Sequence, residues 1–167
     1  MVLEDHVDRG RIVGNRHATE AKPGKQHRLL FDRDDVVSVL QASDLLDGRI
    51  MTAGGSFLDS VPLGADIYML VHVLHNWSDE DCLRILRACR TAMPAHAVLL
   101  IGEHLLEPEP ARGRPTSYLI DIQMMAMFGT ARERTEAEFV SLLSGAEFRP
   151  QQVIPTQSPT WIIEAGS

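Results

Sequence analysis

The stretch ADIYMLVHVLHNWSDEDCLRILRACR, residues 65–90, carries the clearest structural signals in the chain. It opens with a nearly continuous apolar run, ADIYMLVHV (65–73), which is typical of a strand buried on both faces of a parallel sheet. Ser78 is a good helix N-cap, and three acidic residues fill the first turn after it. Small or apolar side chains then recur at helical spacing up to the stop at Pro94: Cys82, Leu83, Leu86, Cys89 and Ala92. The stretch predicts a buried strand followed by an amphipathic helix.

The alternation of strand and helix extends to both sides of this stretch. Upstream, we expect strands at 27–32 and 49–55 with a helix at 34–46 between them. Downstream, we expect a strand at 97–103, a nearly all-apolar helix at 117–129, a helix opened by the capping box Thr135-x-x-Glu138 and closed by Gly145, and antiparallel strands at 148–154 and 160–166. This order predicts an α/β sandwich with a mainly parallel sheet and an antiparallel C-terminal strand pair.

The composition fits one globular domain of 167 residues, with 44% hydrophobic and 23% charged residues. The net charge is −7, and the arginines of the last third are interleaved with acids, so we expect no nucleic-acid partner. No apolar run approaches the roughly 20 residues that cross a bilayer, and the charged N-terminus has no apolar signal segment. We therefore expect a cytoplasmic protein that does not bind membranes.

The two cysteines, Cys82 and Cys89, are expected on the same helix. A separation of seven residues on a helix places them roughly 10 Å apart, whereas a disulfide needs Cα atoms within about 7 Å. They are therefore predicted to be reduced and to pack in the core as small apolar residues.

Three ionisable residues follow predicted strands at the point where each strand ends. They are Asp32, His75 and Glu103. Ligands of open α/β sheets bind beyond the carboxyl ends of the strands. The residues alone therefore predict a site at this edge of the sheet.

Three patches occur in a fixed order: HVLHNWSDED at 72–81, LLIGEHLL at 99–106 and GTARERTEAEF at 129–139. In their order and their residues, these patches resemble motifs of the S-adenosylmethionine-dependent O-methyltransferases of plant phenols and bacterial polyketides. The resemblance runs from about Arg28 to Gly166. It implies a Rossmann-like methyltransferase fold and methyl transfer to a hydroxyl of a small aromatic or polyketide-like molecule.

The resemblance also implies catalytic roles for three residues. His75, in His75-Asn76-Trp77, would remove the proton from the substrate hydroxyl, and Glu103 and Glu133 would flank the imidazole. Two other interpretations stay open from the residues. First, a histidine that follows a buried strand is often structural. Second, the spacing of His72, His75 and the nearby His104 would allow a metal site. No cysteine accompanies these histidines, however, and we expect no metal.

The acceptor would lie against residues of two patches. The resemblance places Met124 against the acceptor ring, and we take Met125, Asn76 and Trp77 as further candidate substrate contacts. A flexible thioether suits irregular aromatic substrates, but Met124 and Met125 could equally pack in the core of an apolar helix.

The cofactor region departs from the family pattern in residues 1–26. The family has a strand, a Val-Asp-x-Gly-Gly-Gly-like loop and then a helix, whereas the candidate loop here, VDRGRIVG (7–14), retains only Gly10 and Gly14. Side chains such as Arg11 would crowd a ligand that glycines admit. We therefore interpret residues 1–26 as a degraded or substituted cofactor loop, with Gly10 as its remaining candidate contact.

Other cofactor contacts are retained in part. Asp32 matches the acid that takes the ribose hydroxyls in the family. In Gly54-Gly55-Ser56-Phe57, Ser56 replaces the adenine-side acid and can form hydrogen bonds without carrying charge, while Phe57 is retained. The resemblance thus implies S-adenosylmethionine as cofactor, held by Asp32, Ser56, Phe57 and Gly10.

Residues 27–167 are accordingly predicted to form the catalytic domain. We expect the N-terminal helical domain, which makes the dimer and covers the substrate in the family, to be absent. We expect a homodimer or association with another chain. The alternative is an inactive methyltransferase remnant that serves as an accessory protein or binds a small molecule without methylating it.

Overall fold

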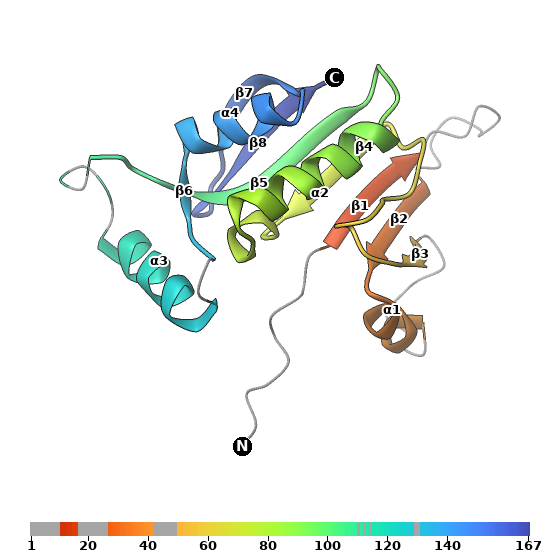
Figure 1. Cartoon of the computed structure of the whole chain (residues 1–167), viewed down its shortest axis with the longest axis horizontal. Helices are drawn as coiled ribbons and strands as arrows, with labels where there is room; N and C mark the ends of the chain where they lie inside the picture. The colour runs from red at the N-terminus through yellow and green to blue at the C-terminus, as the bar shows by residue number, and fades with distance from the viewer. Residues whose placement is uncertain are drawn as a thin grey trace.

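The computed structural model describes residues 11–16, 27–41, 50–109, 111, 113, 115–128 and 131–167 (Figure 1). It forms one extended sheet with the strand order β3-β2-β1-β4-β5-β8-β7, and a short strand, β6, pairs with β5. The strands are β1 (Arg11–Arg16), β2 (His27–Asp32), β3 (Ile50–Gly54), β4 (Ile67–Val71), β5 (Val98–Leu106), β6 (Arg134–Thr135), β7 (Arg149–Pro155) and β8 (Thr160–Gly166).

Most strands of the sheet run in the same direction. β2 pairs in parallel with β3, and β4 pairs in parallel with β5, while β8 pairs antiparallel with both β5 and β7. The α/β class, the mainly parallel sheet and the antiparallel C-terminal pair are therefore confirmed, and β8 has the predicted bounds.

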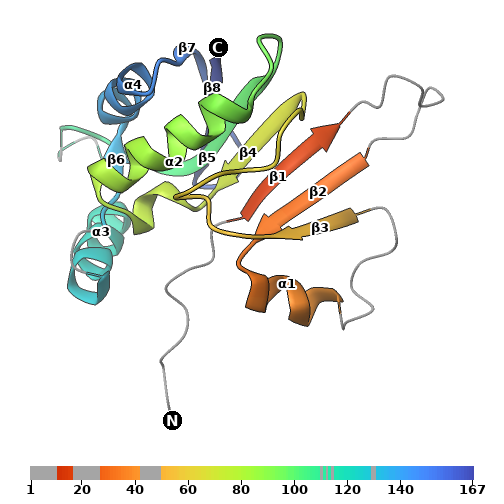
Figure 2. The same ribbon diagram turned by 45° about the vertical axis from the view of Figure 1, so that its right-hand side comes forward.

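Strand β1 is the exception among the central strands, and it corrects one expectation. It pairs antiparallel with both β2 and β4, with Ile12 opposite Phe31 and Leu70 (Figure 2). Residues 11–14, expected in a loop that borders the cofactor, therefore lie in a strand. The β-branched pair Ile12-Val13 favours this conformation, and the two ladders satisfy the backbone groups of the strand on both sides.

The reversal of β1 also changes which of its ends meets the predicted site. Arg11 lies opposite Val71, the last residue of β4, so the amino end of β1 lies at the edge where β2 and β4 end. The carboxyl end of β1 lies at the other edge. β1 therefore does not present its carboxyl end to Asp32 and His75, as a parallel strand that leads into a glycine loop would.

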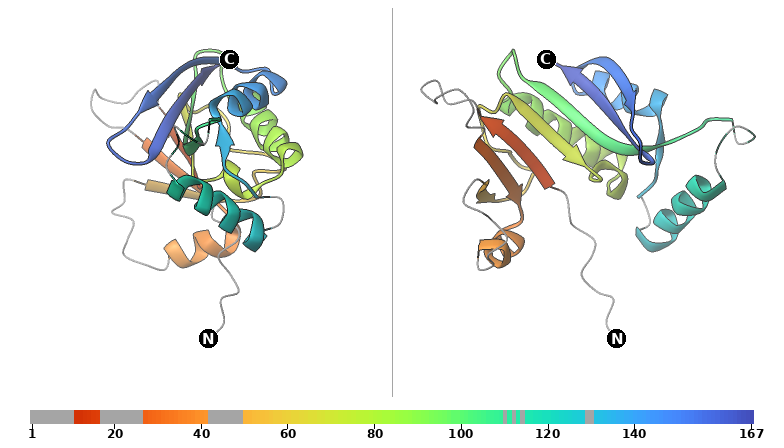
Figure 3. Two further views of the ribbon diagram at one scale, coloured as in Figure 1. Left: turned by 90° about the vertical axis from the view of Figure 1, so that its left-hand side faces the viewer. Right: turned by 180° about the vertical axis from the view of Figure 1, so that it is seen from behind.

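Four α-helices accompany the sheet in the described part of the chain: α1 (Asp34–Gln41), α2 (Asp79–Ala92), α3 (Pro115–Phe128) and α4 (Glu136–Gly145). α2 and α4 lie side by side on one face of the sheet (Figures 1 and 3). α1 lies next to β2 and β3, and α3 stands apart from the α2–α4 layer (Figure 2). The helix expected at 34–46 is confirmed up to Gln41, and residues 42–49 lie outside the described residues.

Helix α2 has the predicted cap and apolar stripe. The Ser78 side chain accepts a hydrogen bond from the backbone N–H of Asp81, and the buried positions of the helix repeat at helical spacing. They are Cys82, Ile85, Leu86, Cys89 and Ala92, so Ile85 is buried in place of the predicted Leu83, which is only partly buried. Both cysteines are buried free thiols, as expected, and they belong to a core shared by α2, α4 and the central strands.

The downstream helices also follow the sequence pattern. α4 begins with the complete capping box, in which Thr135 and Glu138 each bond the other's backbone N–H. α3 confirms the apolar helix expected at 117–129 as far as Phe128 and begins two residues earlier, while residue 129 lies outside the described residues. No helix among the described residues combines the length and apolar character needed to span a membrane.

Candidate active site

His75 lies in a tight turn directly after the buried strand β4. The strand ends at Val71, His72 takes a left-handed backbone conformation with φ of 54°, and residues Leu74–Asn76 form a 3₁₀ turn, η1. A positive φ is uncommon outside glycine, and here it turns the chain sharply out of the sheet. The His75 side chain, 15% exposed, is thereby presented at the carboxyl edge of β4.

Glu103 of β5 holds both the turn and the imidazole. Its carboxylate is fully buried; Oε1 accepts hydrogen bonds from the backbone N–H of Val73 at 2.9 Å and of Leu74 at 2.8 Å. Oε2 lies 2.7 Å from Nδ1 of His75. The expected hydrogen bond between the imidazole and one carboxylate is therefore present, and it engages Nδ1 and leaves Nε2 as the other ring nitrogen.

The surroundings of His75 favour its protonated form. Burial alone would lower the pKa of His75, but the hydrogen bond to Glu103 and the negative charges of Glu103 and Glu133 outweigh it, with Arg134 opposing them. The net effect is a pKa above the ordinary value of 6.5. Such an imidazole is a better proton acceptor than a free histidine side chain.

Glu133 lies in the segment before α4, near enough to His75 for its charge to act on the imidazole. It is 4% exposed, its backbone N–H donates to Asp121 at 2.8 Å, and its Oε1 lies 3.8 Å from Nδ1 of His104. Its buried Oε2 has no hydrogen-bond partner among the described residues. Burial, followed by the charges of Glu103 and Asp121, raises the pKa of Glu133 to about 7 against the attraction of His75 and Arg134.

Three histidines and Glu103 form one cluster. The rings of His72 and His104 lie 5.1 Å apart, and one potential ligand atom from each of His72, His75 and Glu103 falls within 4.8 Å of the others. Two of these side chains are already joined by the short bond between His75 and Glu103. The cluster thus contains one histidine–carboxylate pair with a short hydrogen bond and two further histidines.

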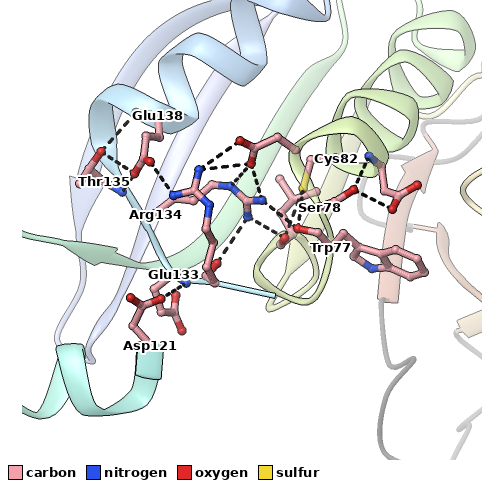
Figure 4. A network of polar contacts seen from close by, with 12 residues as sticks. Trp77, Ser78, Cys82, Asp121, Glu133, Arg134, Thr135 and Glu138 are labelled. Carbon is pink, nitrogen blue, oxygen red and sulfur yellow. Dashed lines mark hydrogen bonds and ion pairs between the residues drawn. The ribbon is translucent and has the colours of Figure 1, made fainter. Parts of the chain in front are cut away.

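Arg134, one of the arginines interleaved with acids in the last third of the chain, is a site residue that the sequence did not single out. Its side chain is fully buried and donates to the carbonyl oxygens of Leu74 and Trp77 and to Asp79 (Figure 4). The sequence signal was weak, because Ala-Arg-Glu-Arg-Thr (131–135) alternates charges as exposed segments do. Asp121 was also not predicted as part of the site, and His72 was considered only as a possible metal ligand.

The candidate cofactor residues gather where β2 and β3 end. Asp32, the last residue of β2, is fully buried; its Oδ1 accepts from the backbone N–H of Arg33, and its carbonyl accepts from Gly55 at 3.0 Å. Ser56 is exposed and Phe57 is buried. A Cβ on Gly55 would come within 2.9 Å of the Phe31 ring, so glycine is needed for this close approach.

The candidate substrate residues are described in part. The ring of Trp77 packs edge-to-face on Phe57 with centroids 5.5 Å apart, which joins the predicted cofactor and substrate sides. Asn76 donates weakly to the carbonyl of His72 at 3.4 Å. Met124 and Met125 lie on α3, but of these two residues the structure describes the backbone alone, and Gly10 lies outside the described residues.

Comparison with known proteins gives a consistent result. The O-methyltransferase domain family matches residues 16–149. The chain is 39% identical over 142 residues to phenazine O-methyltransferase PhzM of Lysobacter antibioticus, covering 82% of this chain and 40% of that protein. It is 42% identical over 169 residues to O-demethylpuromycin-O-methyltransferase of Streptomyces alboniger, covering 95% and 44%. The chain thus spans less than half the length of these relatives.

Solved structures match to a similar extent. Human N-acetylserotonin methyltransferase in complex with SAM aligns with a TM-score of 0.76 and 30% identity, covering 83% of this chain and 40% of that one. NcsB1, an O-methyltransferase from neocarzinostatin biosynthesis in complex with S-adenosyl-L-homocysteine and 1,4-dihydroxy-2-naphthoic acid, aligns with a TM-score of 0.72 and 30% identity, covering 83% and 41%.

Proposed function

The chain belongs to the O-methyltransferase family, and from that premise we propose that it methylates a hydroxyl group of a small aromatic or polyketide-like molecule, with S-adenosylmethionine as the methyl donor. Residues 27–167 would act as the catalytic domain. The observation that carries the proposal is the 2.7 Å contact between Nδ1 of His75 and the buried carboxylate of Glu103.

In this proposal His75 is the general base. Glu103 fixes the tautomer with the proton on Nδ1, so that Nε2 accepts the proton of the substrate hydroxyl. The same carboxylate stabilises the imidazolium that forms as the oxygen loses its proton. Base catalysis of this kind contributes roughly 10²–10⁴-fold to the rate.

Glu133 would support the base electrostatically. The negative charge of Glu133 raises the pKa of His75, and the positive charge of protonated His75 lowers the pKa of Glu133. With its own pKa raised to about 7, Glu133 ionises most readily when His75 carries a proton. The imidazolium is therefore stabilised by two carboxylates at the moment it forms.

The residues present fit the adenosine half of the cofactor. Strand β2 ends with the buried acid Asp32, whose backbone carbonyl accepts a hydrogen bond from Gly55 in the Gly54-Gly55 turn. Both lie at the edge of the sheet where ligands of α/β folds bind. Asp32, Ser56 and Phe57 would hold this half, and we keep Gly10 as a proposed contact. When bound, the cofactor supplies an electrophilic methyl group on a sulfonium.

The acceptor would lie beside the turn that carries His75. We propose Asn76, Trp77, Met124 and Met125 as its contacts. The Trp77–Phe57 pair supports this arrangement, since it brings an aromatic surface next to the candidate cofactor residues. NcsB1 has been solved in complex with 1,4-dihydroxy-2-naphthoic acid, a small hydroxylated aromatic molecule like the acceptor that we propose.

A second function is favoured by the reversed strand β1. The described residues provide no glycine loop after a parallel strand, so the methionine half of the cofactor lacks its expected cradle there. The alternative is therefore an inactive methyltransferase remnant that acts as an accessory protein or binds a small molecule. In either case we propose that the chain functions as a homodimer or with another chain, and in the cytoplasm.

Calorimetric titration with S-adenosylmethionine and S-adenosylhomocysteine separates the two functions. The enzyme proposal expects saturable binding of both, together with methylation of a dihydroxyaromatic probe such as 1,4-dihydroxy-2-naphthoic acid. Absence of binding by the folded chain would contradict the enzyme proposal and support the remnant.

A further inference from the structure

We propose that Arg134, held in place by Asp79, is a positioning residue that fixes the turn carrying His75. The inference rests on the proposed role of His75 as the base. The segment from Leu74 to Trp77 includes η1, and the Arg134 side chain lies directly against it (Figure 4).

The guanidinium of Arg134 bonds two carbonyl groups that flank His75. One terminal nitrogen donates to the carbonyl of Leu74 at 2.8 Å, and the other donates to the carbonyl of Trp77 at 2.8 Å. The side chain is fully buried, and a buried charge is retained only where strong hydrogen bonds compensate for the lost water. The planar fork of arginine is suited to holding both carbonyls at once.

Asp79 holds the guanidinium from the opposite side. Its Oδ1 accepts from Nε of Arg134 at 2.9 Å and from a terminal nitrogen at 2.7 Å. The Asp79 side chain is 54% exposed, so it can be replaced without opening the core. The ion pair fixes the direction of the fork.

The turn is thus held from two sides by residues distant in sequence. Glu103 accepts from the N–H groups of Val73 and Leu74, while Arg134 donates to the carbonyl of Leu74. The backbone N–H of Arg132 also donates to the carbonyl of His75 at 2.9 Å. Because Leu74 is held at both its N–H and its C=O, a loss of the Arg134 bonds would let the turn rotate and draw His75 away from Glu103.

The test measures the His75–Glu103 bond directly by NMR on ¹⁵N-histidine-labelled protein. The Nδ1 proton of His75 should give a low-field resonance that His75→Ala removes. Arg134→Lys keeps the positive charge but replaces the fork with a point donor, and it should broaden or abolish the resonance. Arg132→Ala is the matched control: this arginine also pairs with Asp79 but its side chain bonds none of the 74–77 carbonyls, so the resonance should persist.

Kinetics give an independent readout. Arg134→Lys should lower kcat by about 10²-fold with little change in the KM of the acceptor, because a displaced base affects the transition state more than binding. A failure of the proposed function would appear as wild-type turnover in His75→Ala. The resonance reports on the turn whether or not the chain methylates.

A second variant covers the case in which Arg134→Lys does not fold. Asp79→Asn removes the charge that holds the fork and leaves the core intact, so it should also broaden the His75 resonance. An unchanged resonance in either folded variant would overturn the proposal.

Discussion

At the scale of single residues, the site depends on buried carboxylates that differ in how well they are satisfied. Glu103 uses both oxygens in hydrogen bonds to the turn and to His75. Glu133 is almost as deeply buried, yet its Oε2 has no hydrogen-bond partner within the described ranges. Burial raises the pKa of Glu133, which therefore holds a proton more readily than an exposed glutamate does.

This difference predicts how stability depends on pH. The pKa of Glu133 is raised from 4.5 to about 7 in the folded state, so the folded chain retains a proton that the unfolded chain releases first. The free energy of unfolding should therefore fall as pH rises from about 4.5 to about 7. Glu133→Gln cannot ionise and should reduce this fall by roughly 1–3 kcal/mol, measured by urea unfolding at several pH values.

Glu136→Gln, at an exposed position of α4, serves as the control and should leave the pH profile unchanged. A Glu133→Gln profile that parallels the wild type between pH 4.5 and 7 would show that Glu133 does not hold the extra proton.

The sequence predicted His75, Glu103 and Glu133 as one group because each falls in a motif at a strand end or helix start. It did not predict Arg134, because its partner carbonyls are 57 and 60 residues away in sequence and backbone carbonyls leave no pattern in side-chain types. Buried polar side chains that serve the backbone are therefore hard to find without coordinates.

At the scale of elements, helix α2 connects the site to the core. Its first turn carries Asp79, which bonds Arg134, and its inner face carries Cys82 and Cys89, both with no exposed surface. The sequence predicted this helix well because its apolar spacing, its N-cap and the acidic residues of its first turn all favour the same helix. Strand β1 was not predicted, because its first four residues belong to the motif at 7–14 that was interpreted as a loop. The strands that pair with β1 also cannot be identified from the residues of β1 alone.

Helix α2 makes a prediction about thiol reactivity. Burial raises the pKa of both Cys82 and Cys89 to about 12, and the reactive form is the thiolate. At pH 8 the native chain should therefore react very slowly with Ellman's reagent, and two thiols should react after denaturation. Ser144→Cys, which places a thiol on the exposed side of α4, supplies the reactive reference. Native labelling of the wild type at the rate of that reference would contradict the packing of α2.

At the scale of the whole molecule, the two halves of the sheet differ in how closely they follow the family pattern. The half built from β4, β5, β7 and β8 carries the His75–Glu103 pair on well-matched elements. The half built from β1, β2 and β3 retains Asp32 but has the reversed strand. Under the proposed function, we therefore expect the cofactor side to limit methyl transfer more than the base.

Cofactor affinity should respond to one substitution on that side. Ser56→Asp restores the charge that the family has at this exposed position, and a charged acceptor adds about 1 kcal/mol over a neutral one, or about fivefold in affinity. Calorimetry with S-adenosylhomocysteine measures the change. Ser60→Asp, which adds the same charge at another exposed position nearby, should have little effect. Equal affinities for Ser56→Asp and wild type, with both folded, would show that the adenosine pocket is lost.

The central claim is that His75 is the general base, and the pH dependence of methyl transfer tests it most directly. In the wild type, kcat/KM should rise with pH through an apparent pKa above the 6.5 of ordinary histidine, because Glu103 and Glu133 favour the imidazolium. His75→Ala should lower turnover by about 10²-fold or more and abolish this rise while leaving cofactor binding nearly unchanged. His96→Ala removes another histidine bonded to a carboxylate, Asp66 at 2.8 Å, and should behave as wild type. A His75→Ala variant that methylates as fast as the wild type, with the same pH profile, would contradict the claim.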